Sequence, residues 1–267
     1  MTDDLPPIVL TFAATDPSGG AGIQADILTL TSMGCHALSV VTAITVQDTV
    51  GVEDYFPIDA EWIADQARSV LEDMPVAAFK IGMLGSRAIA EAVHTILKDY
   101  PGVPVVLDPV LTSARGYELA DESLREAMIA LLFPLTTVLT PNSLEARALA
   151  SSADTLDACA QQLMEYGSEF VLITGTHENT PEVMNTLYGN HRKLETFHWE
   201  RLPGSYHGSG CTLASAIAGM LAHGLESFTA IHEAQQYTWN ALKHAHRLGR
   251  GQYLPNRLFW TRGADNE

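Results

Sequence analysis

The chain has 267 residues, of which 15 are Lys or Arg and 32 are Asp or Glu, so its formal net charge is −17. A field of this sign repels nucleic acid and anionic membranes, which excludes a non-specific binder of either. Hydrophobic residues make up 46% and charged residues 18%, a composition typical of a folded protein. We therefore expect a globular protein with a large core and with neither nucleic acid nor membrane as a partner.

The cysteines and the first residues bear on the compartment. The three cysteines are far apart and form no C-x-x-C pair, which is typical of a reduced, cytoplasmic protein: Cys35, Cys159 and Cys211. Residues 1–7 are acidic and carry no apolar run, so we expect no signal peptide.

Apolar runs of strand length alternate with segments of helical periodicity. Strands are predicted at 8–13, 37–46, 77–84, 103–110, 136–142 and 170–175. Helices are predicted at about 24–33, 60–73, 87–98, 121–132 and 155–166, from Ser143, within 205–224, and at about 228–247. A hairpin around Gly189 spans 184–200. This order predicts an α/β fold with a mostly parallel sheet and helices on both faces.

Repeats and linkers are not visible in the sequence, so a single domain over residues 1–267 is expected. Its core would span about 8–250, with a C-terminal tail at 251–267 whose role is open. Ligands of such sheets bind beyond the carboxyl ends of the strands. The informative loops therefore follow Ala13, Val46, Met83, Asp108, Thr140 and Thr174.

A glycine loop precedes the helix within 205–224. Gly208, Ser209 and Gly210 let the backbone approach a ligand closely, and the helix that follows offers free N–H groups and a positive dipole end. Together these features predict a site for a phosphate or a developing anion. A tight turn that caps a helix would explain the same residues, and no Walker A pattern occurs in the chain.

Cys211 follows this loop at the start of the helix. A thiol at a helix N-terminus has a physical reason for a lowered pKa, so it could act as a base or a nucleophile. The alternative is a small buried hydrophobic residue, which is what most free cysteines are.

Further polar residues follow other predicted strands. Gln47 can pair with the edge of an aminated heterocycle, or can simply face water. Met83 could pack on a flat ring or belong to the core. Asp26, just after the glycine-rich segment 16–22, could bind a ligand hydroxyl or be solvated.

Oxygen ligands gather after two neighbouring strands. Asp108 ends the run VPVVLD, and Asn142 and Glu145 follow the run TTVLTP. Mg²⁺ prefers one or two carboxylates together with substrate phosphates and water, so these residues are candidates for a magnesium site. A helix cap or a solvated acid is the alternative for each of them.

Six segments in this order resemble the hydroxymethylpyrimidine/phosphomethylpyrimidine kinases of thiamine biosynthesis. They are TDPSGGAGIQAD (15–26), TAITVQDT (42–49), KIGML (80–84), VVLDPV (105–110), TPNSLE (140–145) and HGSGCT (207–212). The resemblance extends from about residue 8 to about 250. It implies a ribokinase-like three-layer fold, a homodimer, and phosphorylation of 4-amino-5-hydroxymethyl-2-methylpyrimidine and of its monophosphate with ATP and Mg²⁺.

The resemblance also implies roles for matching positions. The substrate pyrimidine would lie among Ala14, Ala21, Asp26, Gln47, Met83 and Val110. The nucleotide would lie along Asn142, Thr174 and Gly175, and the metal would lie at Asp108 and Glu145. The anion hole would be formed by Gly208, Ser209 and Gly210, with Cys211 as the base.

The sequence departs from the family pattern at several points. The segment that usually reads V-K-G-G-H is ITGTH at 173–177, so Thr174 stands where a lysine is expected near the nucleotide phosphates. The usual A-K-S-G is replaced at Ala114 and Arg115, where the positive charge remains without the geometry of lysine. Near the pyrimidine, Ala14 adds a methyl group where the family usually has glycine.

Two other functions are compatible with these observations. A pyridoxal/pyridoxine-type kinase of the same superfamily would share the fold and the anion hole, and only pocket residues such as Gln47 and Met83 would discriminate. A non-catalytic pyrimidine-binding relative is favoured only by the missing lysine at Thr174. The presence of Cys211, Asp108 and Glu145 argues against it.

Overall fold

The structure is a computed structural model that describes residues 5–113 and 116–262. Its main sheet has the order β10-β9-β8-β7-β6-β5-β1-β2, with β9 and β10 as an antiparallel edge on six parallel strands. The bounds are β1 Ile8–Ala13, β2 His36–Val41, β5 Ala78–Ile81, β6 Val105–Leu107, β7 Val138–Leu139, β8 Phe170–Ile173, β9 Glu182–Gly189 and β10 Arg192–Glu200. The predicted α/β class is confirmed.

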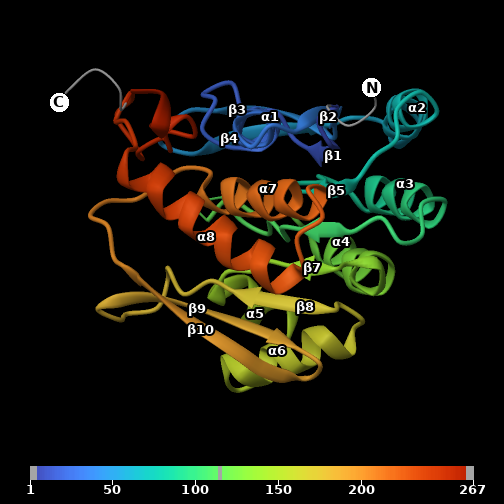
Figure 1. Ribbon diagram of the computed structural model, residues 1–267. Helices are drawn as coiled ribbons and strands as arrows, with labels where there is room; N and C mark the ends of the chain where they lie inside the picture. The colour runs from blue at the N-terminus through green and yellow to red at the C-terminus, as the bar shows by residue number, and fades with distance from the viewer. Residues whose placement is uncertain (1–4, 114–115, 263–267) are drawn as a thin grey trace.

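Helices cover both faces of this sheet (Figure 1). One face carries α1 (Gly22–Ser32), α7 (Ser209–Ala222) and α8 (Ser227–Lys243). The other carries α2 (Ala60–Leu71), α3 (Arg87–Lys98), α4 (Glu122–Ala127), α5 (Ser143–Leu149) and α6 (Leu156–Glu165). The predicted helix at 121–132 is α-helical only to Ala127, after which a π-helical turn (Met128–Leu132) and a 3-10 turn (Phe133–Leu135) follow.

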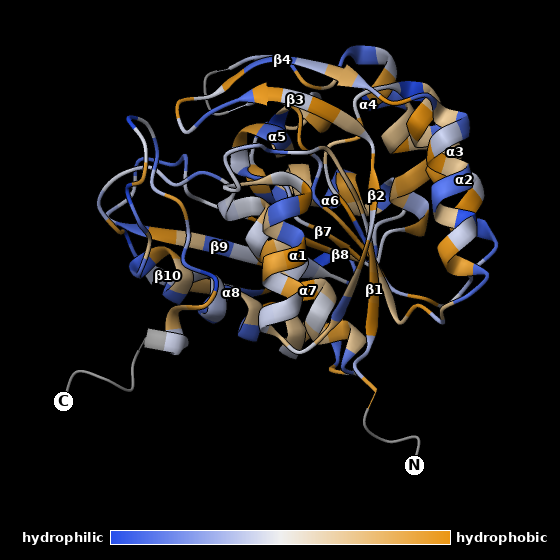
Figure 2. Cartoon of the chain, turned by 90° about the horizontal axis from the view of Figure 1, so that it is seen from above, coloured by the Kyte–Doolittle hydropathy of each residue, from blue (hydrophilic) through white to orange (hydrophobic). Residues whose placement is uncertain are grey.

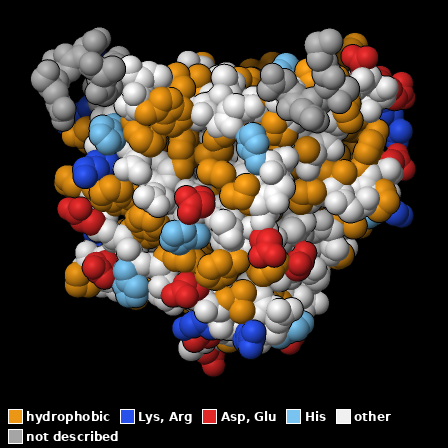
Figure 3. Space-filling view, viewed as in Figure 1, with side chains coloured by type: hydrophobic (Ala, Val, Ile, Leu, Met, Phe, Trp, Pro, Cys, Tyr) orange, Lys and Arg blue, Asp and Glu red, His pale blue; other side chains and the backbone are white. Residues whose placement is uncertain are grey.

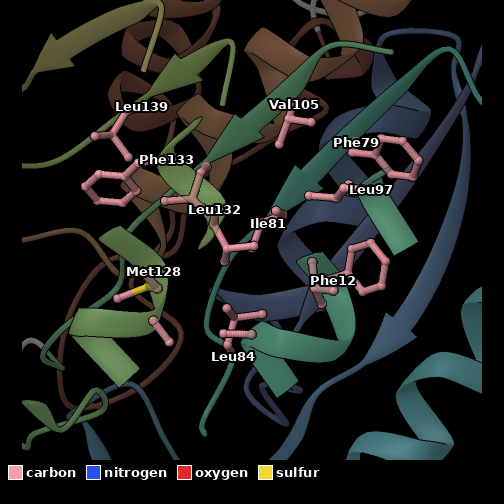
Figure 4. Packing of buried hydrophobic residues seen from close by; sticks show 14 of the residues in the cluster. Phe12, Phe79, Ile81, Leu84, Leu97, Val105, Met128, Leu132, Phe133 and Leu139 are labelled. Atoms are coloured by element: carbon pink, nitrogen blue, oxygen red, sulfur yellow. The ribbon is translucent and has the colours of Figure 1, made fainter. Parts of the chain in front are cut away.

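The strands read as continuous apolar runs because both of their faces are buried. In β1, Leu10 and Phe12 pack with α2 and α3, whereas Val9 packs with α7 on the opposite face. Figure 4 shows Phe12 and Ile81 in the larger of these two clusters. The face under α7 is lined by smaller side chains, and α7 is itself rich in alanine, so this helix lies close to the sheet.

The predicted strand 37–46 is wrong as a single element. Strand β2 ends at Val41, and the chain then leaves the main sheet to form β3 (Ala43–Gln47), which pairs with β4 (Val52–Pro57) in a separate two-stranded sheet (Figure 2). The change of direction is fixed at Thr42, whose hydroxyl donates a hydrogen bond to the Met83 carbonyl. Glu53 and Asp54 interrupt the apolar pattern of β4, so it was not predicted.

The surface agrees with the acidic composition. On the face seen in Figure 3, acidic, histidine and hydrophobic side chains are interspersed, and Lys and Arg side chains form no continuous patch. Among the helices that the structure describes, none combines the length and the apolar character needed to cross a membrane.

Candidate active site

The predicted site residues lie at the carboxyl edge of the parallel strands. Asp108 follows β6 directly, and Asn142 and Thr174 follow β7 and β8. The glycine-rich segment 16–22 follows β1 and leads into α1. The N-terminus of α7 reaches the same edge, because Gly210 lies beside the Asp108 carboxylate. The fold therefore brings together segments that lie far apart in the sequence.

The first turn of α7 has the geometry of an anion-binding site. Gly208 adopts a left-handed conformation with φ of 74°, which favours glycine. The N–H of Thr212 is the first to bond within the helix, to the Gly208 carbonyl at 2.9 Å. The N–H groups of Ser209, Gly210 and Cys211 precede it and have no partner within the helix, so they are available to an anion.

The glycine-rich segment 16–22 packs directly against this turn. A Cβ atom at Gly208 would overlap the carbonyl oxygen of Gly20, and a Cβ atom at Gly20 would overlap the His207 ring. The absence of a side chain at these two glycines therefore lets two loops of the same chain pack in direct contact, which fixes the loops relative to each other.

Cys211 is held by two groups. Its sulfur accepts a hydrogen bond from the N–H of Gly22, and its thiol donates one to the Asp108 carboxylate. Burial raises the pKa of the Cys211 thiol to about 12; the Lys80 charge opposes this rise, while Asp108 and Asp26 add to it. The expectation of a lowered pKa was therefore wrong, since burial among carboxylates outweighs the positive end of the helix.

Asp108 and Glu145 are a pair of buried carboxyl groups. Burial raises the pKa of Asp108 to about 6, although the Lys80 charge opposes the rise. Burial and the nearby Asp108 charge raise the pKa of Glu145 to about 8. Within residues 5–113 and 116–262, no three His, Cys, Asp or Glu side chains converge as a metal site. A pair of carboxyl groups this close together fits a magnesium ion whose other ligands are phosphates and water.

Asn142 and Glu145 also form the capping box of α5. The Asn142 side chain accepts hydrogen bonds from the N–H groups of Leu144 at 2.9 Å and Glu145 at 3.0 Å. Glu145 accepts one from the N–H of Asn142 at 2.9 Å and one from the N–H of Leu111 at 3.4 Å. The helix cap, which was one of the alternatives for these residues, is therefore present. The roles of Asn142 and Glu145 toward a nucleotide or a metal stay predictions.

Asp26 is the centre of a buried polar network that sequence reasoning missed in part. Its carboxylate accepts hydrogen bonds from Thr11 at 2.6 Å, Ser215 at 2.7 Å and the Lys80 ammonium at 2.9 Å. A lysine within the apolar run AFKI was the available signal, because a buried charge needs a partner. The predicted contact of Asp26 with the pyrimidine stays a prediction.

Asp16 organises the glycine-rich segment. Its carboxylate accepts hydrogen bonds from the N–H groups of Ser18 at 2.8 Å and Ala21 at 2.6 Å, and it lies 2.9 Å from Nε2 of His207. Burial by itself would raise the pKa of Asp16, but the hydrogen bonds outweigh it and lower the pKa. No local pattern in the sequence indicates the link between His207 and Asp16, which lie 191 positions apart.

The predicted pyrimidine residues come from several segments of the chain. Gln47 lies on β3, and its amide donates hydrogen bonds to the Thr15 carbonyl at 3.2 Å and to the Thr45 hydroxyl at 2.7 Å. Ala14 is buried, whereas Ala21, Met83 and Val110 are partly exposed. An open cavity of about 450 Å³ begins at Gln47 and is lined also by Pro17, Ser18, Asp48, Thr49, Gly249 and Arg250.

The nucleotide-side residues lie on adjacent strand ends. Thr174 pairs with the segment after β7: its N–H donates to the Pro141 carbonyl at 3.0 Å, and its carbonyl accepts from the N–H of Ser143 at 3.0 Å. The N–H of Gly175 donates to the buried Asn185 side chain at 3.1 Å. The departures at Ala114 and Arg115 lie outside the described residues.

Two nearby arginines are already engaged. Arg147 forms an ion pair with Glu178 at 2.8 Å, and Arg201 donates hydrogen bonds to the carbonyls of Thr176 and Thr180 at 2.9 and 3.0 Å. These two side chains therefore brace the loop after β8, and neither is free to take the place of the lysine that Thr174 lacks.

Comparison with known proteins places this geometry in a family. The family model described as phosphomethylpyrimidine kinase matches residues 16–256. A hydroxymethylpyrimidine/phosphomethylpyrimidine kinase of Mycobacterium tuberculosis is 39% identical over 260 residues, covering 95% of this chain and 94% of the relative.

Solved structures of two kinases superpose closely on this chain. The ADP complex of Bacillus subtilis pyridoxal kinase is 29% identical and superposes with a TM-score of 0.85, covering 96% of this chain and 99% of that one. Phosphomethylpyrimidine kinase from Clostridium difficile is 35% identical with a TM-score of 0.75, covering 87% and 97%. The match to the family model spans the glycine-rich segment, both carboxylates and the turn at Cys211, and this chain belongs to the phosphomethylpyrimidine kinase family.

Proposed function

We propose that this chain transfers the γ-phosphoryl group of ATP to 4-amino-5-hydroxymethyl-2-methylpyrimidine and then to its monophosphate. The observation that carries the proposal is the meeting of Asp108, Cys211 and the free N–H groups of Ser209 and Gly210 at one helix end. Phosphoryl transfer depends on positioning and on charge stabilisation. Because the chain is strongly acidic, positive charge has to be supplied locally, and the N–H groups in the first turn of α7 would do this.

Mg²⁺ bound with the nucleotide would neutralise the transferring phosphoryl group, and Asp108 and Glu145 are the residues that would hold it. The N–H groups of Ser209, Gly210 and Cys211 would orient the same group. Asn142, Thr174 and Gly175 would contact the nucleotide, with engagement of ATP supported by relatives solved with ADP and with AMP-PCP.

Cys211 would serve the first phosphorylation. A thiol with a pKa near 12 keeps its proton at neutral pH, so it can accept the proton of the substrate hydroxyl only as its own proton moves to Asp108. In the second phosphorylation the acceptor is a phosphate monoester, whose second pKa is about 6 and whose oxygen is already ionised. This step needs no base.

A homodimer and a cytoplasmic location are part of the proposal. The outer face of the β3–β4 sheet exposes Ile44, Val46 and Phe56, with exposed fractions of 53%, 57% and 69%. A second copy of the chain would cover this apolar face, as expected from the dimers of the family. Light scattering of the purified protein should give about twice the chain mass, and Phe56→Asp should give the monomer.

The test of the activity is a product assay by mass spectrometry. The protein with Mg²⁺ and ATP would be offered hydroxymethylpyrimidine, its monophosphate or pyridoxal in separate reactions. Monophosphate and diphosphate from the pyrimidine are expected. Binding of the pyrimidine without transfer to any acceptor would contradict the proposal and favour a non-catalytic binding protein.

A pyridoxal kinase is the second candidate. The observation in its favour is structural: two pyridoxal kinases superpose with a TM-score of 0.85 over 96% of this chain, against 0.75 and 87% for the Clostridium kinase. Turnover of pyridoxal alone in the same assay would select this function over the first.

A further inference from the structure

The C-terminal segment returns to the mouth of the site. After α8, the N–H of Gln252 donates a hydrogen bond to the Thr49 carbonyl in the β3–β4 turn at 2.8 Å. Tyr253 then pairs with the segment before α7, since its N–H donates to the Ser205 carbonyl and its carbonyl accepts from the N–H of His207, both at 2.9 Å. The chain thereby links the hairpin to the anion-binding turn.

Arg257 follows and turns inward. Only 4% of this residue is exposed. Its guanidinium donates to the Gly20 carbonyl at 2.5 Å, to the Thr212 hydroxyl at 3.1 Å and to the Gly19 carbonyl at 3.4 Å. All three acceptors are neutral oxygens, while the carboxylates of Asp16 and Asp26 balance the charge at longer range. A buried arginine with this set of partners joins loops and does not form a close ion pair.

The backbone of this segment is anchored on α8. The Tyr237 hydroxyl donates to the Arg257 carbonyl at 2.9 Å, and the N–H of Asn256 donates to the Ala241 carbonyl at 2.9 Å. Since α8 packs against α7, the guanidinium is presented from a rigid support.

Arg257 reaches Gly208 by two routes. In the first, the Gly20–Ala21 peptide is held at both ends: its carbonyl accepts from Arg257, and its N–H donates to Asp16. The same carbonyl oxygen packs against Gly208 so closely that a side chain there would overlap it. In the second route, the Thr212 hydroxyl accepts from Arg257 and donates to the Gly208 carbonyl at 2.8 Å.

We propose that Arg257 is a positioning residue for phosphoryl transfer, which fixes the anion-binding turn at Gly208–Gly210 relative to the glycine-rich segment. This inference rests on the proposed kinase function. The planar guanidinium suits the task because it holds several donors in a fixed fork, whereas an ammonium offers a single charged centre.

The test compares Arg257→Met and Arg257→Lys with Arg68→Met, a matched control in which the lost arginine lies on α2 and pairs with Asp99 at the surface. Misplacement of reacting groups by about 1 Å costs about 100-fold in rate. Arg257→Met should lower kcat by about 10- to 100-fold with little change in KM for the pyrimidine. Arg257→Lys should recover part of the loss, and the control should match the wild type.

A second readout does not depend on the acceptor. Calorimetry would give the affinity of each variant for ADP and for AMP-PCP, which adds the γ-phosphate position. Arg257→Met should weaken AMP-PCP binding several-fold and leave ADP binding unchanged. If the wild type phosphorylates none of the acceptors, the proposed function fails, whereas this ratio still tests the positioning role.

Thr212→Val keeps the test decisive if Arg257→Met does not fold. It removes the second route to Gly208 with almost no change in side-chain shape, and it should lower kcat several-fold in the same direction. Unchanged kcat and an unchanged AMP-PCP to ADP ratio in the folded variants would overturn the proposal. A loss confined to thermal stability would do the same.

Discussion

The Lys80 ammonium lies 2.9 Å from the Asp26 carboxylate, and neither side chain has any exposed surface. Lys80 comes from β5 and Asp26 from α1, so the pair joins the sheet to a helix beside the anion-binding turn. Burial by itself would lower the pKa of Lys80, but Asp26, Cys211 and Asp108 outweigh it and raise the pKa above its ordinary value. The lysine therefore stays charged and supplies fixed positive charge beneath an acidic site.

Removal of both members of this pair should cost less than the sum of the two single removals. Lys80→Met leaves the Asp26 charge buried without its ion-pair partner, which should lower the free energy of unfolding by roughly 3–5 kcal/mol. The double variant Lys80→Met/Asp26→Leu should lose less than the sum of the two single changes. Urea unfolding of the four proteins gives the coupling energy, and additive losses would contradict a direct interaction.

Much of the fold was predictable from the sequence, because strands buried on both faces are continuous apolar runs. The run at 103–110 predicted β6, and 8–13 predicted β1. The run at 37–46 has the same composition, but its second half leaves the main sheet for the hairpin with β4. That change depends on tertiary hydrogen bonds of Thr42, to which local composition gives no signal.

The site was predictable where chemistry is local and was not where it is long-range. The turn at Gly208–Gly210 and its position before a helix follow from neighbouring residues. Lys80 finds its partner Asp26 across 54 positions, and Arg257 finds the Gly20 carbonyl across 237. The predicted direction of the Cys211 pKa shift was wrong for the same reason, since the residues that bury the thiol and the carboxylates near it come from distant segments.

Asp16 should make the protein sensitive to acid. Its pKa is lowered in the folded protein, so the unfolded chain binds more protons near and below pH 4. The stabilisation is complete above the ordinary value and is lost as pH falls through the lowered one. Between pH 6 and pH 3, the urea midpoint of unfolding should fall further in the wild type than in Asp16→Asn. An equal fall in both would exclude this contribution.

Glu145 should be replaceable by glutamine in the fold but not in metal binding. Glutamine keeps the capping box of α5, and it removes a charge that burial and Asp108 oppose. With EDTA at pH 8, Glu145→Gln should therefore melt at or above the temperature of the wild type. With ADP present, Mg²⁺ should raise the melting temperature of the wild type more than that of the variant. An equal effect of Mg²⁺ would remove Glu145 from the metal site.

Thr174→Lys should strengthen ATP binding. The side chain lies at the end of β8, and a lysine there would add a cation where Arg147 and Arg201 are already engaged. A partly exposed charge contributes up to about 1 kcal/mol, so KM for ATP should fall roughly fivefold. Thr176→Lys adds the same charge two residues later at an exposed position and is the matched control. An equal change in both variants would show a general effect of net charge.

Cys211→Ala should separate the two phosphorylations. In the proposed mechanism the thiol passes the proton of the substrate hydroxyl toward Asp108, and loss of a group that transfers a proton costs about 100- to 10,000-fold. The first phosphorylation should fall within this range, whereas the second, whose acceptor is already ionised, should fall by less than about tenfold.

The measurement is a pair of single-turnover assays, one with the pyrimidine alcohol and one with its monophosphate. Cys159→Ala is the control, because that cysteine is also free but is buried on α6 among core residues. Equal losses in both assays would show that Cys211 shapes the turn and does not move a proton. A loss only with the alcohol, smaller at high pH where the hydroxyl ionises more readily, would assign the proton transfer to the sulfur.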